Sequence, residues 1–278
     1  MEPHILLISC SDRSGLVHRI TGIIFRHQLN IISNSEFVER KCNYFFMRTE
    51  FSGKFDAAAL MNELKATLPT DAVMQLSPRI KKDIVVLVTK EHHCLSDLLI
   101  RQEFNELNAN IVSVISNHEN LHELTTKFKT PFYCISHEGK TREQHEQQML
   151  KCIHEFRPAY LVLAKYMRVL SPHFVSQFPN QIINIHHSFL PAFAGASPYT
   201  QAYDRGVKII GATAHFVNHG LDDGPIIAQG VIPVTHAHSP TEMAQAGHDV
   251  EKIVLARSLK LVLENRVFVH NSKTVIFD

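Results

Sequence analysis

Four short apolar runs, separated by stretches with helical spacing, limit most strongly how this chain can fold. They are residues 83–89, 110–117, 159–166 and 181–187 ("DIVVLVT", "NIVSVISN", "AYLVLAKY" and "QIINIHH"). Most of their apolar residues are consecutive rather than alternating, which is typical of parallel strands buried on both faces. Helical stretches such as residues 94–107 and 142–156 lie between them. We therefore predict an α/β domain with a Rossmann-like, mostly parallel sheet, which would bind ligands beyond the carboxyl ends of its strands.

The first 80 residues predict a separate, smaller unit. Strands are expected at residues 4–10, 30–39, 43–51 and 72–80, with one helix from Leu16 and another that carries Leu60 and Leu64. Ser11 or Asp12 is the expected cap of the first helix. This order of elements, βαββαβ, is ferredoxin-like. The basic stretch "RIKKD" then indicates a boundary, so we predict domains at residues 1–81 and 82–278.

The rest of the second domain is expected to contain a strand at residues 209–217, a long helix at 239–265 and a closing hairpin at 266–278. Lys+Arg and Asp+Glu number 28 and 27, and the chain has no long basic run, so nucleic acid is not an expected partner. Its five cysteines form no CxxC pair, which favours free thiols in a reducing compartment. We see no signal peptide and no run of about 18 apolar residues, and we expect a cytoplasmic protein without membrane contact.

The fourth apolar run ends in an amide and two imidazoles. Asn184 and His186 are two residues apart, so along a strand their side chains point to the same face. An amide N–H can hold a developing oxyanion, an imidazole can transfer protons, and a carboxylate such as Asp222 would orient that imidazole. By the same alternation His187 faces away and is expected to be structural. The chain has 19 histidines, and Asp222 could equally be the solvated tip of a loop.

The passages "NIHHSFLPAF", "GATAHFVNHGLDDGP" and "AKYMRVLSP" resemble the catalytic core of the folate-dependent formyltransferase superfamily. That resemblance implies formyl transfer by Asn184, His186 and Asp222, with His215 as site support. It also implies folate contacts by the loop that recognises the pterin ring, which maps onto Met167, Arg168, Val169 and Leu170. The substrate would then be 10-formyltetrahydrofolate itself, with no metal and no dissociable cofactor.

Members of this superfamily differ in the molecule that accepts the formyl group. Transferases that act on a phosphorylated amine use a glycine-rich loop after the first strand, because backbone N–H groups must approach the phosphate closely. Here that place is taken by Lys90, Glu91, His92 and His93, and Glu91 would repel a phosphate. A tRNA acceptor is disfavoured because the chain stops soon after the catalytic core and its charge is balanced.

Water therefore remains as the expected acceptor. The stretches "KEHHCLSDLL", "HHSFLPAF" and "DVEKIVLARSL" resemble the formyltetrahydrofolate deformylase family. This resemblance implies hydrolysis of 10-formyltetrahydrofolate to tetrahydrofolate and formate, which would supply formate for purine biosynthesis and balance the one-carbon folate pools. Ser197 and Thr200 depart from the family pattern, where Lys or Asn and then His are expected.

The N-terminal unit resembles an ACT domain, a regulatory module that often binds amino acids. "CSDRSGLVHRIT" carries that resemblance and implies an effector site at Asp12 and Gly15, in a homo-oligomer. The same stretch could be a tight turn with a helix cap and no ligand. Two alternatives to the hydrolase stay open: transfer to an unidentified amine, and a catalytically inactive amino-acid-sensing protein.

Overall fold

A computed structural model describes residues 2–191 and 198–278, which form two compact units. The first unit contains the residues up to Ile80 together with Glu264–Phe268 and Val275–Asp278. The second contains Lys81–Leu263 and Val269–Thr274. The chain therefore returns to its first unit after completing the second, which the sequence alone does not indicate.

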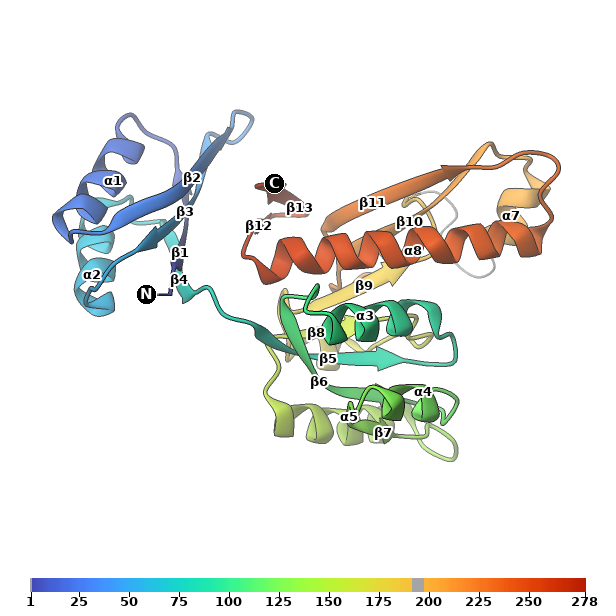
Figure 1. Ribbon diagram of the computed structural model, residues 1–278. Coiled ribbons are helices and arrows are strands. Elements are labelled where there is room, and N and C mark those ends of the chain that lie inside the picture. Colours follow the sequence, from blue (N-terminus) through green and yellow to red (C-terminus); the bar gives the residue numbers. More distant parts are fainter. Residues whose placement is uncertain (1, 192–197) are drawn as a thin grey trace. The chain divides into compact units, whose positions relative to one another are not determined.

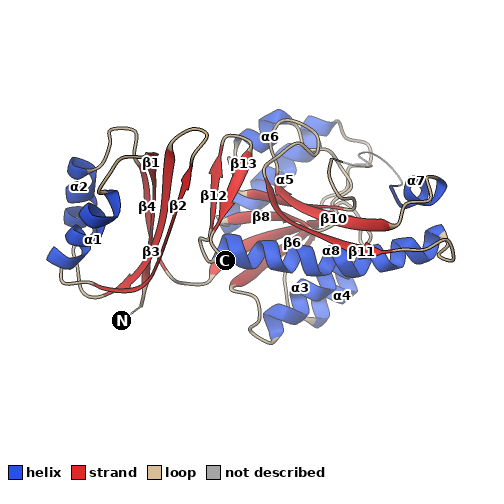
Figure 2. Cartoon of the chain, turned by 90° about the horizontal axis from the view of Figure 1, so that it is seen from above, coloured by secondary structure: helices blue, strands red, loops and turns tan. Residues whose placement is uncertain are grey.

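The first unit has the predicted ferredoxin-like fold. Its sheet has the order β2-β3-β1-β4, and the strands are β1 (His4–Ser11), β2 (Asn30–Glu39), β3 (Tyr44–Ser52) and β4 (Val73–Pro78). All neighbouring strands are antiparallel. Helices α1 (Leu16–Arg26) and α2 (Ala57–Thr67) cover one face (Figures 1 and 2).

Both faces of this sheet carry buried side chains. Under the helices, Leu6 and Ile8 of β1 pack with Ile20 and Ile23 of α1 and with Leu60 of α2. On the other face, Ile5, Leu7 and Phe46 pack with residues from the end of the chain, namely Phe268, Val275 and Phe277. Burying a side chain of this kind contributes about 1.5–3 kcal/mol, so the returning segment supplies a substantial share of this core.

The second unit is built on a mixed sheet of order β11-β10-β9-β8-β5-β6-β7. Its strands are β5 (Lys82–Val88), β6 (Ala109–Ser116), β7 (Phe132–Cys134), β8 (Tyr160–Leu163), β9 (Ile182–His186), β10 (Ile209–Phe216) and β11 (Ile226–Pro233). The pairs from β9 to β7 are parallel, and the pairs that involve β10 are antiparallel. The prediction of a mostly parallel sheet is confirmed.

Helices cover both faces of this sheet. They are α3 (His93–Glu103), α4 (His122–Lys127), α5 (Arg142–Phe156), α6 (Pro172–Ser176), α7 (Pro198–Asp204) and α8 (Pro240–Leu263). On one face, Met149 and Ile153 of α5 and Phe174 of α6 pack against strand residues such as Leu87 and Leu161. The long helix α8 runs beside β10 and β11 and packs against α3 (Figure 1). Strands β12 (Val267–His270) and β13 (Lys273–Ile276) form the expected hairpin.

Two details differ from the sequence expectations. The N-cap of α1 is Gly15 in a left-handed conformation with φ 84°, not Ser11 or Asp12. Ser11 instead belongs to β1 and donates hydrogen bonds from its backbone N–H and its hydroxyl to Asp71. Strand β11 and the short helices α6 and α7 were not predicted. Over the described ranges, no helix is both long and apolar enough to cross a membrane.

Candidate active site

Asn184 and His186 lie at the carboxyl end of β9, in the middle of the sheet. The neighbouring strand β10 is antiparallel, and its His215 is paired directly with Asn184. Directly paired residues of antiparallel strands point to the same face, so three polar side chains share one face of the sheet here. Strand register therefore brings His215 to the two residues that the sequence singled out.

Asp222 reaches this face through the loop that follows β10. Gly224 is required there, because a Cβ at this position would lie 1.6 Å from the carbonyl oxygen of Phe216. Asp222 itself has φ 53°, a left-handed conformation that Asp tolerates better than most residues. Asn218 closes the loop, since its amide accepts from Gly220 N–H and donates to the carbonyl of Asp223. The sequence "DDG" thus suits the turn that carries the carboxylate to the sheet.

The Asp222 carboxylate lies between two imidazoles. Its Oδ2 is 3.4 Å from His186 Nδ1, and its Oδ1 is 3.8 Å from His215 Nε2. The hydrogen bond with His186 lowers the pKa of Asp222, against the opposing effect of burial. Asp222 is therefore ionised at neutral pH and can orient the His186 ring through Nδ1.

His215 fixes the orientation of the Asn184 amide. Its Nδ1 is 2.8 Å from the carbonyl oxygen of Phe216, which can only accept, so Nδ1 carries the proton. Burial lowers the pKa of His215. In the neutral ring Nε2 is then an acceptor, and it lies 3.2 Å from Asn184 Nδ2. One amide N–H of Asn184 is thereby held by His215, and the second can donate to another group.

One ring nitrogen of His186 is buried and has no hydrogen-bond partner among the described residues. Its side chain is 6% exposed, and within residues 2–191 and 198–278 nothing hydrogen bonds to Nε2. A buried polar atom without a partner is uncommon and often marks a ligand position. Because Nδ1 faces Asp222, Nε2 is the nitrogen that can exchange a proton with a substrate.

The expectation that His187 faces away from Asn184 and His186 was wrong. Strand β9 ends at His186, so strict alternation no longer applies, and the His187 ring stacks on that of His186 with centroids 5.0 Å apart. His187 also lines the same cavity as Asn184 and His186. Burial lowers its pKa to about 4, with further lowering by Lys165 and His186. His187 is therefore a neutral neighbour of His186 at pH 7.

The loop 167–170 forms another wall of this cavity, as expected. Met167 and Val169 are 56% and 58% exposed, so apolar side chains face the open space. Their backbones are held by hydrogen bonds, since Met167 N–H donates to Thr89 and the Val169 carbonyl accepts from Arg142. Further on, Glu146 accepts hydrogen bonds from the backbone and hydroxyl of Ser171. These contacts fix the loop but also engage the Met167 donor.

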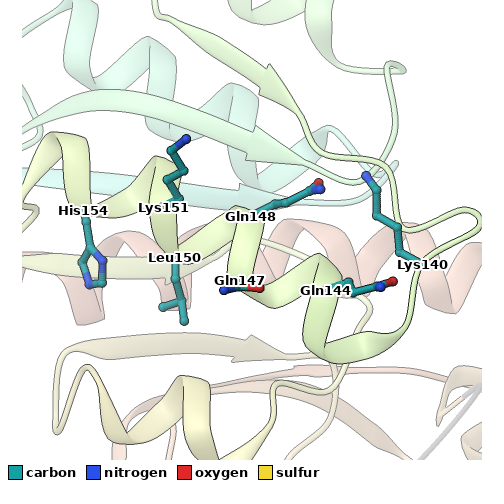
Figure 3. A pocket seen from close by; sticks show the side chains of 7 residues that line it. All are labelled: Lys140, Gln144, Gln147, Gln148, Leu150, Lys151 and His154. Atoms are coloured by element: carbon teal, nitrogen blue, oxygen red, sulfur yellow. The ribbon is translucent and has the colours of Figure 1, made fainter.

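The cavity that unites these groups has a volume of about 670 Å³, a size suited to a small organic ligand. Its lining includes Asn184, His186, His187, His215, Asp222, Lys165 and the residues 166–170 and 217–221. A larger hollow, of about 850 Å³, lies on the outer side of α5 (Figure 3). Amide and basic side chains such as Gln144, Gln148 and Lys151 line it. The first cavity joins an acid, a base and an amide donor, and we take it as the candidate active site.

Sequence reasoning missed two charged residues beside the site. Lys165 is 4% exposed, and its Nζ lies 3.3 Å from an oxygen of Glu251, which is 0% exposed. Glu251 stands at helical spacing from Val254 and Leu255 in a helix whose apolar face was recognised. A glutamate on the buried face of a helix was the sequence signal that could have identified Glu251.

The two residues of the expected effector site lie in the first unit. Asp12 is half-buried and follows β1, and its N–H donates to the carbonyl of Asn43. Gly15 is the N-cap of α1, and no side chain caps this helix N-terminus. Of the two positions that depart from the family pattern, Thr200 is exposed in α7, and Ser197 lies outside the described residues.

Comparison with known proteins agrees with both units. Residues 82–259 match the formyl transferase family, and residues 4–68 match the ACT domain family. A glycinamide ribonucleotide transformylase from Symbiobacterium toebii has a TM-score of 0.69 and 26% identity, covering 71% of this chain and 95% of its own.

Matches that cover nearly the whole chain indicate a narrower family. A formyltetrahydrofolate deformylase of Haemophilus influenzae is 53% identical, with 99% of each chain covered. The crystal structure of a formyltetrahydrofolate deformylase from Pseudomonas syringae has a TM-score of 0.96 and 38% identity, covering 100% of this chain and 95% of its own. The chain belongs to the formyltetrahydrofolate deformylase family.

Proposed function

We propose that the protein hydrolyses 10-formyltetrahydrofolate to tetrahydrofolate and formate. The observation that carries this proposal is the convergence of the Asn184 amide, the His186 imidazole and the Asp222 carboxylate on one cavity. This set contains an oxyanion donor, a proton carrier and a group that sustains the charge of that carrier. Family membership over almost the full chain supports water as the acceptor.

Each residue has a distinct role in the proposed reaction. Water adds to the formyl carbon and forms the new C–O bond, while the negative charge that develops on the formyl oxygen is stabilised by Asn184 and by protonated His186. Asp222 positions the water and keeps His186 charged. His186 then gives its proton to N10 and the C–N10 bond breaks. Of the two protons that the water brought, one returns to His186 and the other passes to solvent as formate leaves. Removal of one such oxyanion donor costs about 10²–10³-fold in rate.

The pterin ring is proposed to lie against the loop that contains Met167, Arg168, Val169 and Leu170. The exposed faces of Met167 and Val169 offer an apolar surface to a flat heterocycle. His215 is proposed as a positioning residue, since its neutral ring holds the Asn184 amide. No metal or dissociable cofactor takes part in these steps.

The other proposals concern the setting of the reaction. An amino acid would bind at Asp12 and Gly15 of the ACT unit, with residues 1–81 as the regulatory domain and 82–278 as the catalytic domain. We infer a homo-oligomer in the cytoplasm that supplies formate for purine biosynthesis. A helix N-terminus without a side-chain cap, as in α1, can receive a carboxylate, which supports this effector site.

Formate release tests the central proposal. Purified protein is mixed with 10-formyltetrahydrofolate without any amine, and formate and tetrahydrofolate are measured together. We expect the two products in equal amounts. Tetrahydrofolate formation only after addition of an amine would identify a transferase instead, and absence of both products would identify an inactive binding protein.

A further inference from the structure

The proposed hydrolysis needs a second proton acceptor besides His186. The attacking water brings two protons, and one of them returns to His186 only after that ring has protonated N10. The other proton must leave as the C–O bond forms, because the bound water becomes strongly acidic at that moment. Protonated His186 cannot receive it, since its Nε2 proton is used on N10 and its Nδ1 faces Asp222.

Two titratable groups of the site are already engaged. The hydrogen bond with His186 lowers the pKa of Asp222, so its carboxylate is a poor acceptor of a further proton. His215 uses Nδ1 toward the carbonyl of Phe216 and Nε2 toward the Asn184 amide. Neither group is therefore a suitable acceptor for the proton of the water.

The other charged or titratable groups of the cavity lining are also unsuitable. Three of them are cations that have no free lone pair for a proton, namely Arg142, Lys165 and Arg168. Tyr166 keeps its own proton at neutral pH, because burial raises its pKa. His219 belongs to the loop 217–221 and is exposed to solvent.

His187 remains, and it lies directly against the proton carrier. The rings of His186 and His187 are stacked with centroids 5.0 Å apart and 20° between their planes. Because the rings are nearly parallel, a small molecule bound beside them can contact the edge of each. Among the described residues, the His187 ring has aromatic contacts with His186 and Tyr199 and no hydrogen bond. Its nitrogens are therefore available to water in the cavity.

The surroundings of His187 keep it in the form that accepts a proton. Burial and then the charges of Lys165 and His186 lower its pKa to about 4, against the opposing effect of Glu251 and Glu91. The Lys165 ammonium is held in place, 3.3 Å from Glu251 Oε2 and 3.7 Å from Glu91 Oε2. At neutral pH His187 is thus a free base, and a proton that it takes up passes readily to solvent.

We propose that His187 is the catalytic base that receives a proton from the attacking water, an inference that rests on the proposed hydrolysis. A lone pair of the water oxygen forms the C–O bond, one water proton passes to a ring nitrogen of His187, and the O–H electrons stay on oxygen. His186 protonates N10, and the electrons of the breaking C–N10 bond stay on nitrogen. The remaining hydroxyl proton returns to His186, and His187 releases its proton to solvent. One water is consumed, and tetrahydrofolate, formate and one proton are formed.

Rescue by free imidazole tests this role. His187→Ala removes the ring and leaves space for a small base, whereas His187→Gln keeps a side chain of similar size that binds no proton at neutral pH. Formate release from 10-formyltetrahydrofolate is measured for the wild type and both variants over a range of substrate concentrations. Each series is repeated with increasing imidazole, and enzyme-free reactions are subtracted.

We expect both variants to have a kcat about 10²-fold below the wild type, with KM within about threefold, because the base acts on water and not on folate. Imidazole should raise the kcat of His187→Ala at least about tenfold, with saturation, and should leave His187→Gln unchanged. Asn184→Ala is the matched control. It loses an oxyanion donor at a cost of about 10²–10³-fold in rate, which imidazole cannot replace.

The outcomes separate this role from the hydrolysis itself. Wild-type formate release together with a kcat of either variant within about threefold of the wild type would overturn the role of His187 alone. A slow His187→Ala that imidazole does not rescue would also overturn it. If His187→Ala does not fold, the kcat and KM of His187→Gln decide. Absence of formate release by the wild type would overturn the proposed hydrolysis and this inference with it.

Discussion

Two polar groups lie side by side at the same edge of the second sheet, and their hydrogen bonding differs. Around Asn184, His186 and Asp222, the His186 Nε2 atom has no partner among the described residues. Beside it, both oxygens of the buried Glu251 are engaged by Tyr199, His93 and Lys165. A buried polar atom without a hydrogen-bond partner costs free energy unless a ligand supplies that partner. A buried charged group whose oxygens are all paired chiefly fixes geometry. His186 Nε2 is therefore free to receive a ligand, whereas the Glu251 carboxylate holds its neighbours in place.

The largest expected effect follows from removing the His186 imidazole, whose Nε2 has no hydrogen-bond partner among the described residues. His186→Ala should lower formate release by about 10³–10⁴-fold, because both proton transfer and charge stabilisation are lost. Its apparent free energy of unfolding should change far less than its rate, which denaturant titration would measure. His154→Ala on the outer side of α5 is the control and should keep full activity. A His186→Ala variant within tenfold of the wild-type rate would contradict the assigned role.

The next effect should appear in stability. Lys165→Met leaves Glu251 and Glu91 without their shared cation, and an unpaired buried charge costs about 3–5 kcal/mol. Urea denaturation should show this loss, while Lys151→Met on the surface of α5 should stay within about 0.5 kcal/mol of the wild type. If Lys165→Met is as stable as Lys151→Met, the ion pairs of Lys165 do not stabilise Glu251 and Glu91 in the way described above.

A smaller effect should depend on pH through His187. Its pKa is about 4 in the folded protein against 6.5 as the ordinary value, so the unfolded chain binds its proton first as pH falls. The stability that depends on neutral His187 is therefore present above pH 6.5 and is lost as pH falls toward 4. The loss from this residue is up to about 3 kcal/mol.

His187→Gln has no such proton to gain. Unfolding free energies of both proteins at several pH values between 7 and 4.5 should show the wild type losing stability relative to the variant. Parallel pH curves for the two proteins would indicate that His187 is not buried in its neutral form.

Local patterns were sufficient to predict the first residues of the candidate site. Asn184 and His186 follow from strand alternation, and Asp222 and His215 follow from motifs that resemble a known family. The pairing of His215 with Asn184 could not be read from the sequence, because it depends on the register between β9 and β10. His187 was misjudged because alternation was extended one residue past the end of its strand.

Other features depend on contacts between distant parts of the chain. Strand β11 contains Gly230, which in a sequence suggests a turn. In the structure this glycine allows close packing of α8, since a Cβ there would lie 2.7 Å from a methyl group of Val254. The pairing of Lys165 with Glu251 likewise becomes visible only when α8 is placed against the sheet.

The return of the chain to its first unit has a consequence for how this protein is made. The face of β1 that carries Ile5 and Leu7 is covered by Phe268 and Phe277, which are synthesised only after the whole second sheet. A nascent chain therefore displays an apolar strand surface while the second unit is being made, and this surface is covered only once Phe268 and Phe277 have emerged. Removal of the β12-β13 hairpin would re-expose that surface and favour aggregation.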